Sequence, residues 1–328
     1  VTERLFSFFA RANYSYQDKY MLSASIRHEG SSKFAADNRW ANFWSATAGW
    51  RISNEEFMKD FDWLDDLKIR FGYGVTGNND FSATYMANML GSDTNWMMPN
   101  GTWAYSYGKS QNVNPNLGWE EKKEWNLGVD YSFFEGRLYG KFDYYRREVD
   151  NLLFSVKVPQ PPYTQGSQMQ NIGSMESKGW EFEVGGDIIR TKDFTWSSSM
   201  NLSHNTGKIL TLEGDNSYHN GNGFVAPGTP GDAARMEAGS TIGSFYMWKF
   251  AGFDDEGSFL LYNKDGEVIP AAQKTENDKQ YIGNYTPKLI IGWSHTLTYK
   301  NFDLGINLRS WIDFDVYNTI NMYYGIQG

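Results

Sequence analysis

Very short turns alternate with long irregular segments along this chain, and each short turn joins two runs of alternating apolar and polar residues. The short turns lie at 17–19, 135–136, 191–193 and 300–301, with a somewhat longer connection at 54–66. The long segments are 28–39, 78–120, 151–178 and 211–286. Successive side chains of a strand point to opposite faces, so each pair of runs predicts an antiparallel hairpin with one apolar and one polar face. Short turns at one rim and long loops at the other are typical of outer-membrane β-barrels.

Ten runs of this kind can be counted along the sequence. Each is long enough for a tilted membrane crossing, which takes roughly 9–11 residues, whereas strands of soluble proteins average about 5–6. The predicted fold class is therefore all-β, an antiparallel up-and-down transmembrane β-barrel, in preference to a soluble sandwich. Segment 211–286 also contains an apparent hairpin at 245–253 and 258–262. We expect it to be structure within a large extracellular loop, but two further membrane strands would give twelve.

Composition is compatible with this class and excludes others. Aromatic residues make up 17% of the chain, and the low mean hydropathy of −0.59 does not exclude a β-barrel, because only every second residue of a membrane strand would face lipid. The chain has no cysteine, so disulfides and thiolate metal sites are impossible. A net charge of −9 argues against a nucleic acid partner, which would need clustered Lys and Arg. The chain starts with a strand pattern and no signal peptide, so we expect a piece of a larger protein.

Five blocks of sequence resemble the SusC/RagA-type TonB-dependent outer-membrane transporters of Bacteroidota. They are WRISNEEFM at 50–58, LKIRFGYGVTGN at 67–78, NPNLGWE at 114–120, NIGSMESKGWE at 171–181 and GNYTPK at 283–288. The blocks are spread over nearly the whole chain. The resemblance implies that residues 1–328 are a partial transmembrane barrel domain, the C-terminal portion of a barrel of about 22 strands with a plug inside. The plug is expected outside this chain, and the long extracellular loops are expected at about 78–120, 151–178 and 211–286.

The resemblance also implies a function. It is TonB-dependent active import of oligosaccharides or peptides across the outer membrane. The implied partners are a SusD-like surface lipoprotein acting as a lid, TonB bound through the missing N-terminal region, and outer-membrane lipid. Two alternatives stay open from the residues alone: a passive outer-membrane porin, which would use the same strands without a plug, and a surface glycan-binding β-protein.

Catalysis is not predicted, and no cofactor is expected. The four histidines are scattered without the spacing of a metal site. One acidic cluster, Asp254, Asp255 and Glu256, is a weak calcium candidate because that ion prefers grouped oxygen ligands. Aspartate followed by glycine is also an ordinary turn sequence, which is the favoured interpretation.

The loops carry the candidates for substrate contact, because exposed aromatic rings beside amides suit stacking on sugars or on peptide side chains. These candidates are Trp96, Trp103, Tyr105, Tyr107, Tyr163, Gln165, Tyr218, His219 and Phe224. Packing of the loops against each other, or against the lid, is the competing interpretation for each of them. Charged residues of the polar strand faces are candidates for lining the lumen or contacting the plug: Arg70, Asp130, Asp143, Arg147, Glu181, Glu183 and Arg309.

Overall fold

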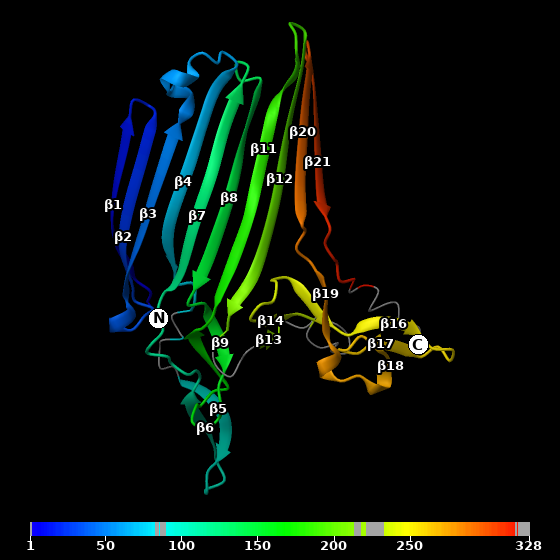
Figure 1. Cartoon of the computed structure of the whole chain (residues 1–328). Helices are drawn as coiled ribbons and strands as arrows, with labels where there is room; N and C mark the ends of the chain where they lie inside the picture. Colours follow the sequence, from blue (N-terminus) through cyan, green and yellow to red (C-terminus); the bar gives the residue numbers. More distant parts are fainter. Residues whose placement is uncertain are drawn as a thin grey trace.

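Ten antiparallel strands stand side by side in one tall, tilted sheet (Figure 1). The structure is a computed structural model that describes residues 2–82, 85, 90–212, 218–220, 233–318 and 320. In spatial order the strands are β1 (Leu5–Tyr16), β2 (Tyr20–Ser31), β3 (Trp40–Arg51), β4 (Leu64–Asn78), β7 (Glu120–Phe133), β8 (Leu138–Asp150), β11 (Ser174–Arg190), β12 (Phe194–Thr211), β20 (Leu289–Tyr299) and β21 (Phe302–Ile312). The all-β prediction is confirmed. The described residues contain no helix long and apolar enough to cross a membrane.

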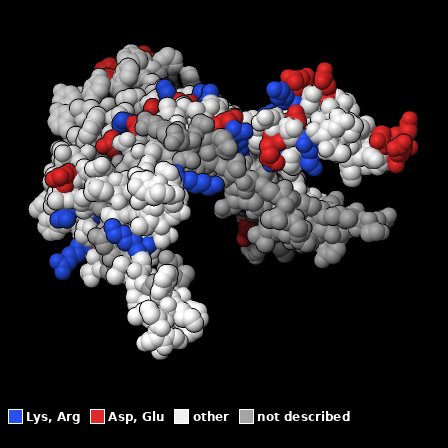
Figure 2. Space-filling view, turned by 90° about the horizontal axis from the view of Figure 1, so that it is seen from below, with Lys and Arg blue, Asp and Glu red and all other residues white. Residues whose placement is uncertain are grey.

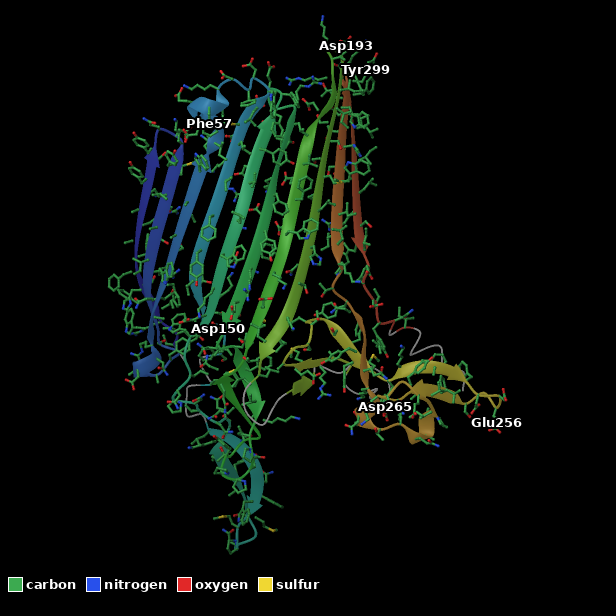
Figure 3. The ribbon with its side chains drawn as sticks, in the orientation of Figure 1. Phe57, Asp150, Asp193, Glu256, Asp265 and Tyr299 are labelled. Atoms are coloured by element: carbon green, nitrogen blue, oxygen red, sulfur yellow. The ribbon has the colours of Figure 1, made fainter. Side chains whose placement is uncertain are left out.

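The short turns gather at one end of this sheet, called here the short-turn end. Phe57, Asp193 and Tyr299 mark it in Figure 3, while Asp150 lies at the opposite, loop end. The β1–β2 turn is tight enough that Gln17 and Asp18 both take positive φ angles, 51° and 54°. A β-turn with positive φ at both central residues has a twist that matches the twist of the strands it joins. The longer β3–β4 connection holds two short 3-10 turns, Ile52–Asn54 and Glu56–Met58.

Several small sheets extend from the loop end (Figure 1). They pair β5 (Leu90–Met97) with β6 (Trp103–Lys109), β9 (Leu153–Lys157) with β10 (Ser167–Asn171), β13 (Tyr218–Asn220) with β14 (Arg235–Glu237), and β15 (Ser244–Met247) with β19 (Gln280–Asn284). A three-stranded sheet contains β16 (Lys249–Phe253), β17 (Phe259–Tyr262) and β18 (Val268–Pro270). The hairpin expected at 245–253 and 258–262 therefore lies outside the main sheet, which has ten strands within the described residues. One detail differs, because residues 244–247 pair with β19 and not with 258–262.

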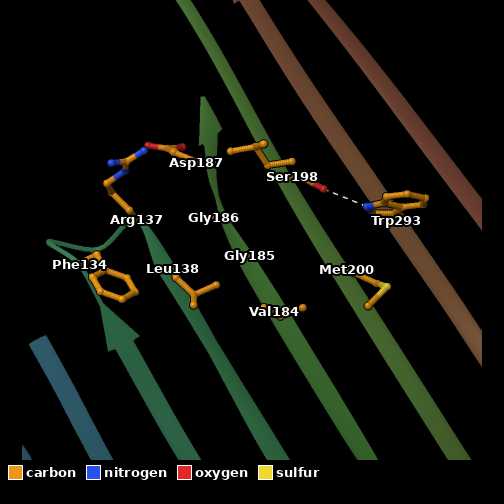
Figure 4. A pocket seen from close by; sticks show the side chains of 11 residues that line it. Phe134, Arg137, Leu138, Val184, Gly185, Gly186, Asp187, Ser198, Met200 and Trp293 are labelled. Atoms are coloured by element: carbon orange, nitrogen blue, oxygen red, sulfur yellow. Dashed lines mark hydrogen bonds between the residues drawn. The ribbon is translucent and has the colours of Figure 1, made fainter. Parts of the chain in front are cut away.

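Apolar side chains follow the outward parity of the strands. Phe182, Leu202 and Ile291 lie in register across β11, β12 and β20. Nearer the short turns the same face has a groove of about 480 Å³ (Figure 4). Beside it the Trp293 indole Nε1 donates a hydrogen bond to Ser198 Oγ at 2.9 Å. An indole N–H in apolar surroundings needs such a partner.

A compact, mainly aromatic cluster is buried at the loop end, next to β3. Its buried members are Phe34, Phe43, Phe81, Leu117 and Trp119. They come from three connecting segments and one strand, so this cluster joins loops that are far apart in sequence. The Trp119 Nε1 donates to the Arg39 carbonyl at 3.1 Å, which satisfies the buried indole. Residues 114–120, one of the blocks of the resemblance, therefore contribute to the packing of the loop end.

Candidate functional site

Charged side chains form a network across the inward face of β4, β7 and β8. The Arg70 guanidinium binds Asp130 through two hydrogen bonds, 2.7 and 2.9 Å long, and also reaches Asp143 at 3.1 Å. The pairing of Arg70 with Gly128 across β4 and β7 makes room for it, since a Cβ on Gly128 would lie 2.7 Å from the Arg70 Cζ. A forked guanidinium suits such bidentate carboxylate binding.

Two further ion pairs continue this face. Arg147 Nε contacts Glu124 at 2.8 Å, and Lys141 Nζ contacts Glu183 at 3.1 Å. Five of the seven predicted lumen residues thus enter ion pairs, namely Arg70, Asp130, Asp143, Arg147 and Glu183. The described residues include no ion-pair partner within 4.0 Å for Glu181 or Arg309. The structure gives this face the polar character expected of a wet barrel interior.

Four of the predicted contact residues lie on the β5–β6 hairpin, which projects from the loop end (Figure 1). Trp103, Tyr105 and Tyr107 alternate along β6, so they share one face of it. Trp96 is opposite Ala104 in the register and therefore lies on the other face. All four side chains are about two-thirds exposed, with Trp96 and Trp103 at 66% each. The three aromatic side chains of β6 therefore lie together on one exposed face, called here the aromatic platform.

The amides of segment 151–178 behave differently, because they tie the loops together. Gln165 Nε2 donates to the Lys109 carbonyl at 2.7 Å. The Asn112 side chain, in turn, donates to the Gln165 and Ser167 carbonyls at 2.7 and 2.8 Å. Tyr163 lines a polar pocket together with Asn114, Asn116, Gln168, Gln170 and Asn171. Gln165 is thus already engaged in holding the loop, whereas Tyr163 faces a pocket.

The third group of predicted contact residues lies around β13. Tyr218 and His219 belong to that strand, which pairs with β14, and Phe224 lies outside the described residues. In the calcium candidate, Asp254 Oδ1 accepts hydrogen bonds from the backbone N–H groups of Glu256 and Ser258. This is the usual role of an aspartate in a turn. Across the described residues no group of three His, Asp or Glu side chains is placed to hold a metal ion.

One polar hub was not singled out from the sequence. Glu55 accepts hydrogen bonds from Tyr20 Oη at 2.6 Å, Trp50 Nε1 at 3.0 Å and Lys19 Nζ at 3.1 Å. These bonds, that of Tyr20 first, lower the pKa of Glu55 from 4.5 to about 2. The hub fastens the β3–β4 connection to the β1–β2 turn. Its sequence signal was the block at 50–58, which contains both Trp50 and Glu55.

The sequence and the fold are both similar to those of known proteins. Residues 1–318 match the family model described as TonB dependent receptor-like, beta-barrel. The TonB-dependent receptor SusC of Bacteroides thetaiotaomicron is 34% identical over 95% of this chain, and the TonB-dependent receptor P3 of Formosa agariphila is 33% identical over 96%. Among solved structures, the RagAB peptide transporter superposes with a TM-score of 0.81 at 27% identity, covering 94% of this chain.

This chain spans about a third of the length of these relatives: 32% of SusC, 32% of P3 and 33% of the RagAB chain. The match covers both the main sheet and the segments at its loop end. The prediction of a SusC/RagA-type relationship is confirmed, as is the assignment to an outer-membrane β-barrel. The chain belongs to the TonB-dependent receptor-like β-barrel family.

Proposed function

We propose that the protein containing this barrel portion imports oligosaccharides or peptides across the outer membrane, using energy delivered through TonB. The observation that carries the proposal is the match of residues 1–318 to the receptor barrel family, together with the likeness to SusC and to the RagAB peptide transporter. A SusD-like surface lipoprotein acts as the lid, and the short turns face the periplasm. The charged inward face supports the proposal because a plug or a polar substrate can bind there.

Active transport is tested in cells that carry the full-length protein. We expect uptake of a labelled oligosaccharide or peptide to stop when TonB is deleted or the proton gradient is collapsed. A passive porin would continue to conduct, since diffusion through an open barrel needs no energy. Uptake that survives both treatments would therefore contradict the importer and favour the porin.

The aromatic platform of β6 is the proposed substrate contact. Trp103→Ala should weaken binding of the transported ligand about tenfold, equivalent to about 1.4 kcal/mol, because a stacked ring contributes on that scale. Trp96→Ala is the matched control, since Trp96 is equally exposed on the opposite face of the same hairpin. Binding is measured by calorimetry on the purified full-length protein. Equal losses of affinity in the two variants would show that the β6 face has no specific role in binding the substrate.

A further inference from the structure

The groove on the outward face of the main sheet combines an apolar floor with a charged rim (Figure 4). Its volume of about 480 Å³ is within the range of ligand pockets, roughly 300–1,000 Å³. Val184, Met200 and Trp293 form its floor and pair across β11, β12 and β20, two residues along from the outward row described above. Side chains two residues apart in a strand share a face, so the floor of the groove also faces outward.

A step in the edge of the sheet positions the charged rim. β8 pairs with β11 only as far as Gly186, and the Asp187 backbone N–H then donates to the Arg137 carbonyl at 2.9 Å. β11 continues to Arg190, with a register shift at Ile188 relative to β12. Such a bulge bends the strand that contains it. The groove therefore ends at the β7–β8 turn, while β11 and β12 extend beyond that turn (Figure 1).

Two opposite charges stand at this rim. Arg137 and Asp187 both line the groove, and Figure 4 shows them at the same end of it. Asp187 Oδ1 accepts a hydrogen bond from Ser197 Oγ at 2.7 Å, and Oδ2 lies 3.6 Å from Arg190 Nη1. None of the ion pairs among the described residues includes Arg137. The rim thus offers a guanidinium, with its five N–H donors, beside a carboxylate.

Aromatic rings mark the rim as the level of the lipid headgroups. Phe134 lines the groove, and its ring centroid lies 6.3 Å from that of Phe133. The Phe133 ring in turn lies 5.6 Å from Trp63, on the β3–β4 connection. Aromatic side chains gather at the two membrane–water interfaces of a barrel. The groove therefore begins at headgroup level and continues along the strands into the hydrocarbon region.

We infer that the groove binds one phospholipid of the periplasmic leaflet, a zwitterionic lipid with an ammonium headgroup such as phosphatidylethanolamine. An acyl chain lies on the apolar floor, the phosphate binds Arg137, and the ammonium faces Asp187. A guanidinium binds phosphate oxygens through paired, charge-assisted hydrogen bonds, and a carboxylate attracts an ammonium group. The inference rests on the proposed function for one point, that the short turns face the periplasm.

The position of the groove disfavours other occupants. The strands that form its floor are each paired on both edges, so the rest of a barrel continues from β1 and β21 and not over the groove. A plug would lie against the polar inward face. The loop end, which Figure 2 shows with its acidic and basic side chains, faces the external leaflet and is remote from this rim. A second copy of the chain would have to desolvate both Arg137 and Asp187, which is costly without matched partners.

The headgroup contact is tested by native mass spectrometry of the purified full-length protein with added phosphatidylethanolamine. We expect wild type to retain one lipid molecule and Arg137→Ala to bind it at least about tenfold more weakly, because the charge-assisted bonds to phosphate are lost. Lys192→Ala is the matched control, since Lys192 is an exposed cation at the same end that does not line the groove. It should bind within about twofold of wild type, and equal losses in the two variants overturn the inference.

The acyl chain and the choice of lipid are tested separately. Val184→Phe fills the floor and should also weaken binding at least about tenfold by excluding the chain. Val129→Phe is the control, because Val129 lies on the outward face of β7 outside the groove. Wild type should prefer phosphatidylethanolamine to phosphatidylglycerol, which has no ammonium, and Asp187→Asn should remove this preference. Retention of detergent alone, unchanged binding by Val184→Phe or equal affinity for the two lipids overturns the inference.

A further measurement does not depend on the folding of these variants. A photo-crosslinking amino acid replaces Met200 in cells, and the adduct is identified by mass spectrometry. A phospholipid adduct supports the inference, whereas crosslinks only to a second copy, to another protein or to a glycolipid of the external leaflet overturn it. Lipid binding is measured without TonB or substrate, so its failure is distinguishable from failure of the proposed import. Uptake that needs no TonB, in a protein that binds the lipid as expected, overturns the proposed function alone.

Discussion

Glu55 shows how one side chain can hold two turns together. Its carboxylate accepts hydrogen bonds from Tyr20, Trp50 and Lys19, which lowers its pKa from 4.5 to about 2. A depressed pKa means that the folded state prefers the charged form. Its contribution to stability is therefore complete above about pH 4.5 and is lost as the pH falls through about 2.

Glu55→Gln should remove part of this acid sensitivity. The loss of barrel stability between pH 4.5 and 2 should be smaller in the variant than in the wild type, because glutamine has no proton to take up. Thermal unfolding followed by circular dichroism at several pH values measures this. Glu56→Gln is the neighbouring control, because Glu56 is exposed and its ion pair with exposed Lys59 lies outside the hub. Identical pH profiles for wild type and Glu55→Gln would refute the hub.

On the inward face, Arg70 similarly joins side chains of neighbouring strands, because it pairs with Asp130 and Asp143. Arg70→Ala leaves Asp130 and Asp143 close together without a cation, which should cost about 1–2 kcal/mol of stability because the site is partly hydrated. Arg309→Ala is the control on the same face, with an expected change within about 0.5 kcal/mol. Unfolding in urea compares the two. Adding Asp143→Asn to Arg70→Ala should recover part of the loss, and a further loss would contradict the network.

At the scale of an element, the facing of each strand follows from its parity. Ile291 of β20 pairs with Leu202 on the outward face, whereas Asn307 of β21 follows the inward parity opposite Ser294. Ile291→Arg should cost roughly 2–4 kcal/mol near the middle of the bilayer and impair assembly, while Asn307→Arg should be tolerated. Heat-modifiable migration of the full-length barrel reports assembly. Comparable damage from both variants would show that the facing is misassigned.

Irregularities within the strands and contacts between loops set which side chains lie together, and the alternation of apolar and polar residues does not predict them. A regular strand would separate Phe250 from Phe253, but the bulge at Gly252 unites them. Trp96 and Trp103 look equivalent in the sequence, yet the register places them on opposite faces of one hairpin. From the sequence, Gln165 is a candidate for substrate contact or for loop packing, and the structure shows its amide donating to the Lys109 carbonyl, 56 residues away. Such partners depend on how loops meet, which local patterns do not encode.

At the scale of the whole molecule, the two ends of the sheet have different roles. Polar hubs such as Glu55 fasten the short-turn end, whereas buried aromatic rings such as Phe34 and Trp119 join the segments of the loop end. The aromatic platform of β6 and the exposed rings of Phe250, Phe253 and Phe259 both extend from the loop end (Figure 1). This division explains why the proposed substrate contacts concentrate there, since loops held by a rigid wall carry recognition.

Local sequence patterns are enough to predict the strands, their two faces and the two kinds of connection. Period-two alternation and turn chemistry are local, so residues such as Leu127 and Gly136 reveal their roles from their immediate neighbours. The ion pairs of Arg70, the hub at Glu55 and the contacts among Phe250, Phe253 and Phe259 become visible in the three-dimensional fold and not in the sequence. Their partners come from other strands or depend on a shifted register, and the packing free energy that selects them exists only in the assembled fold.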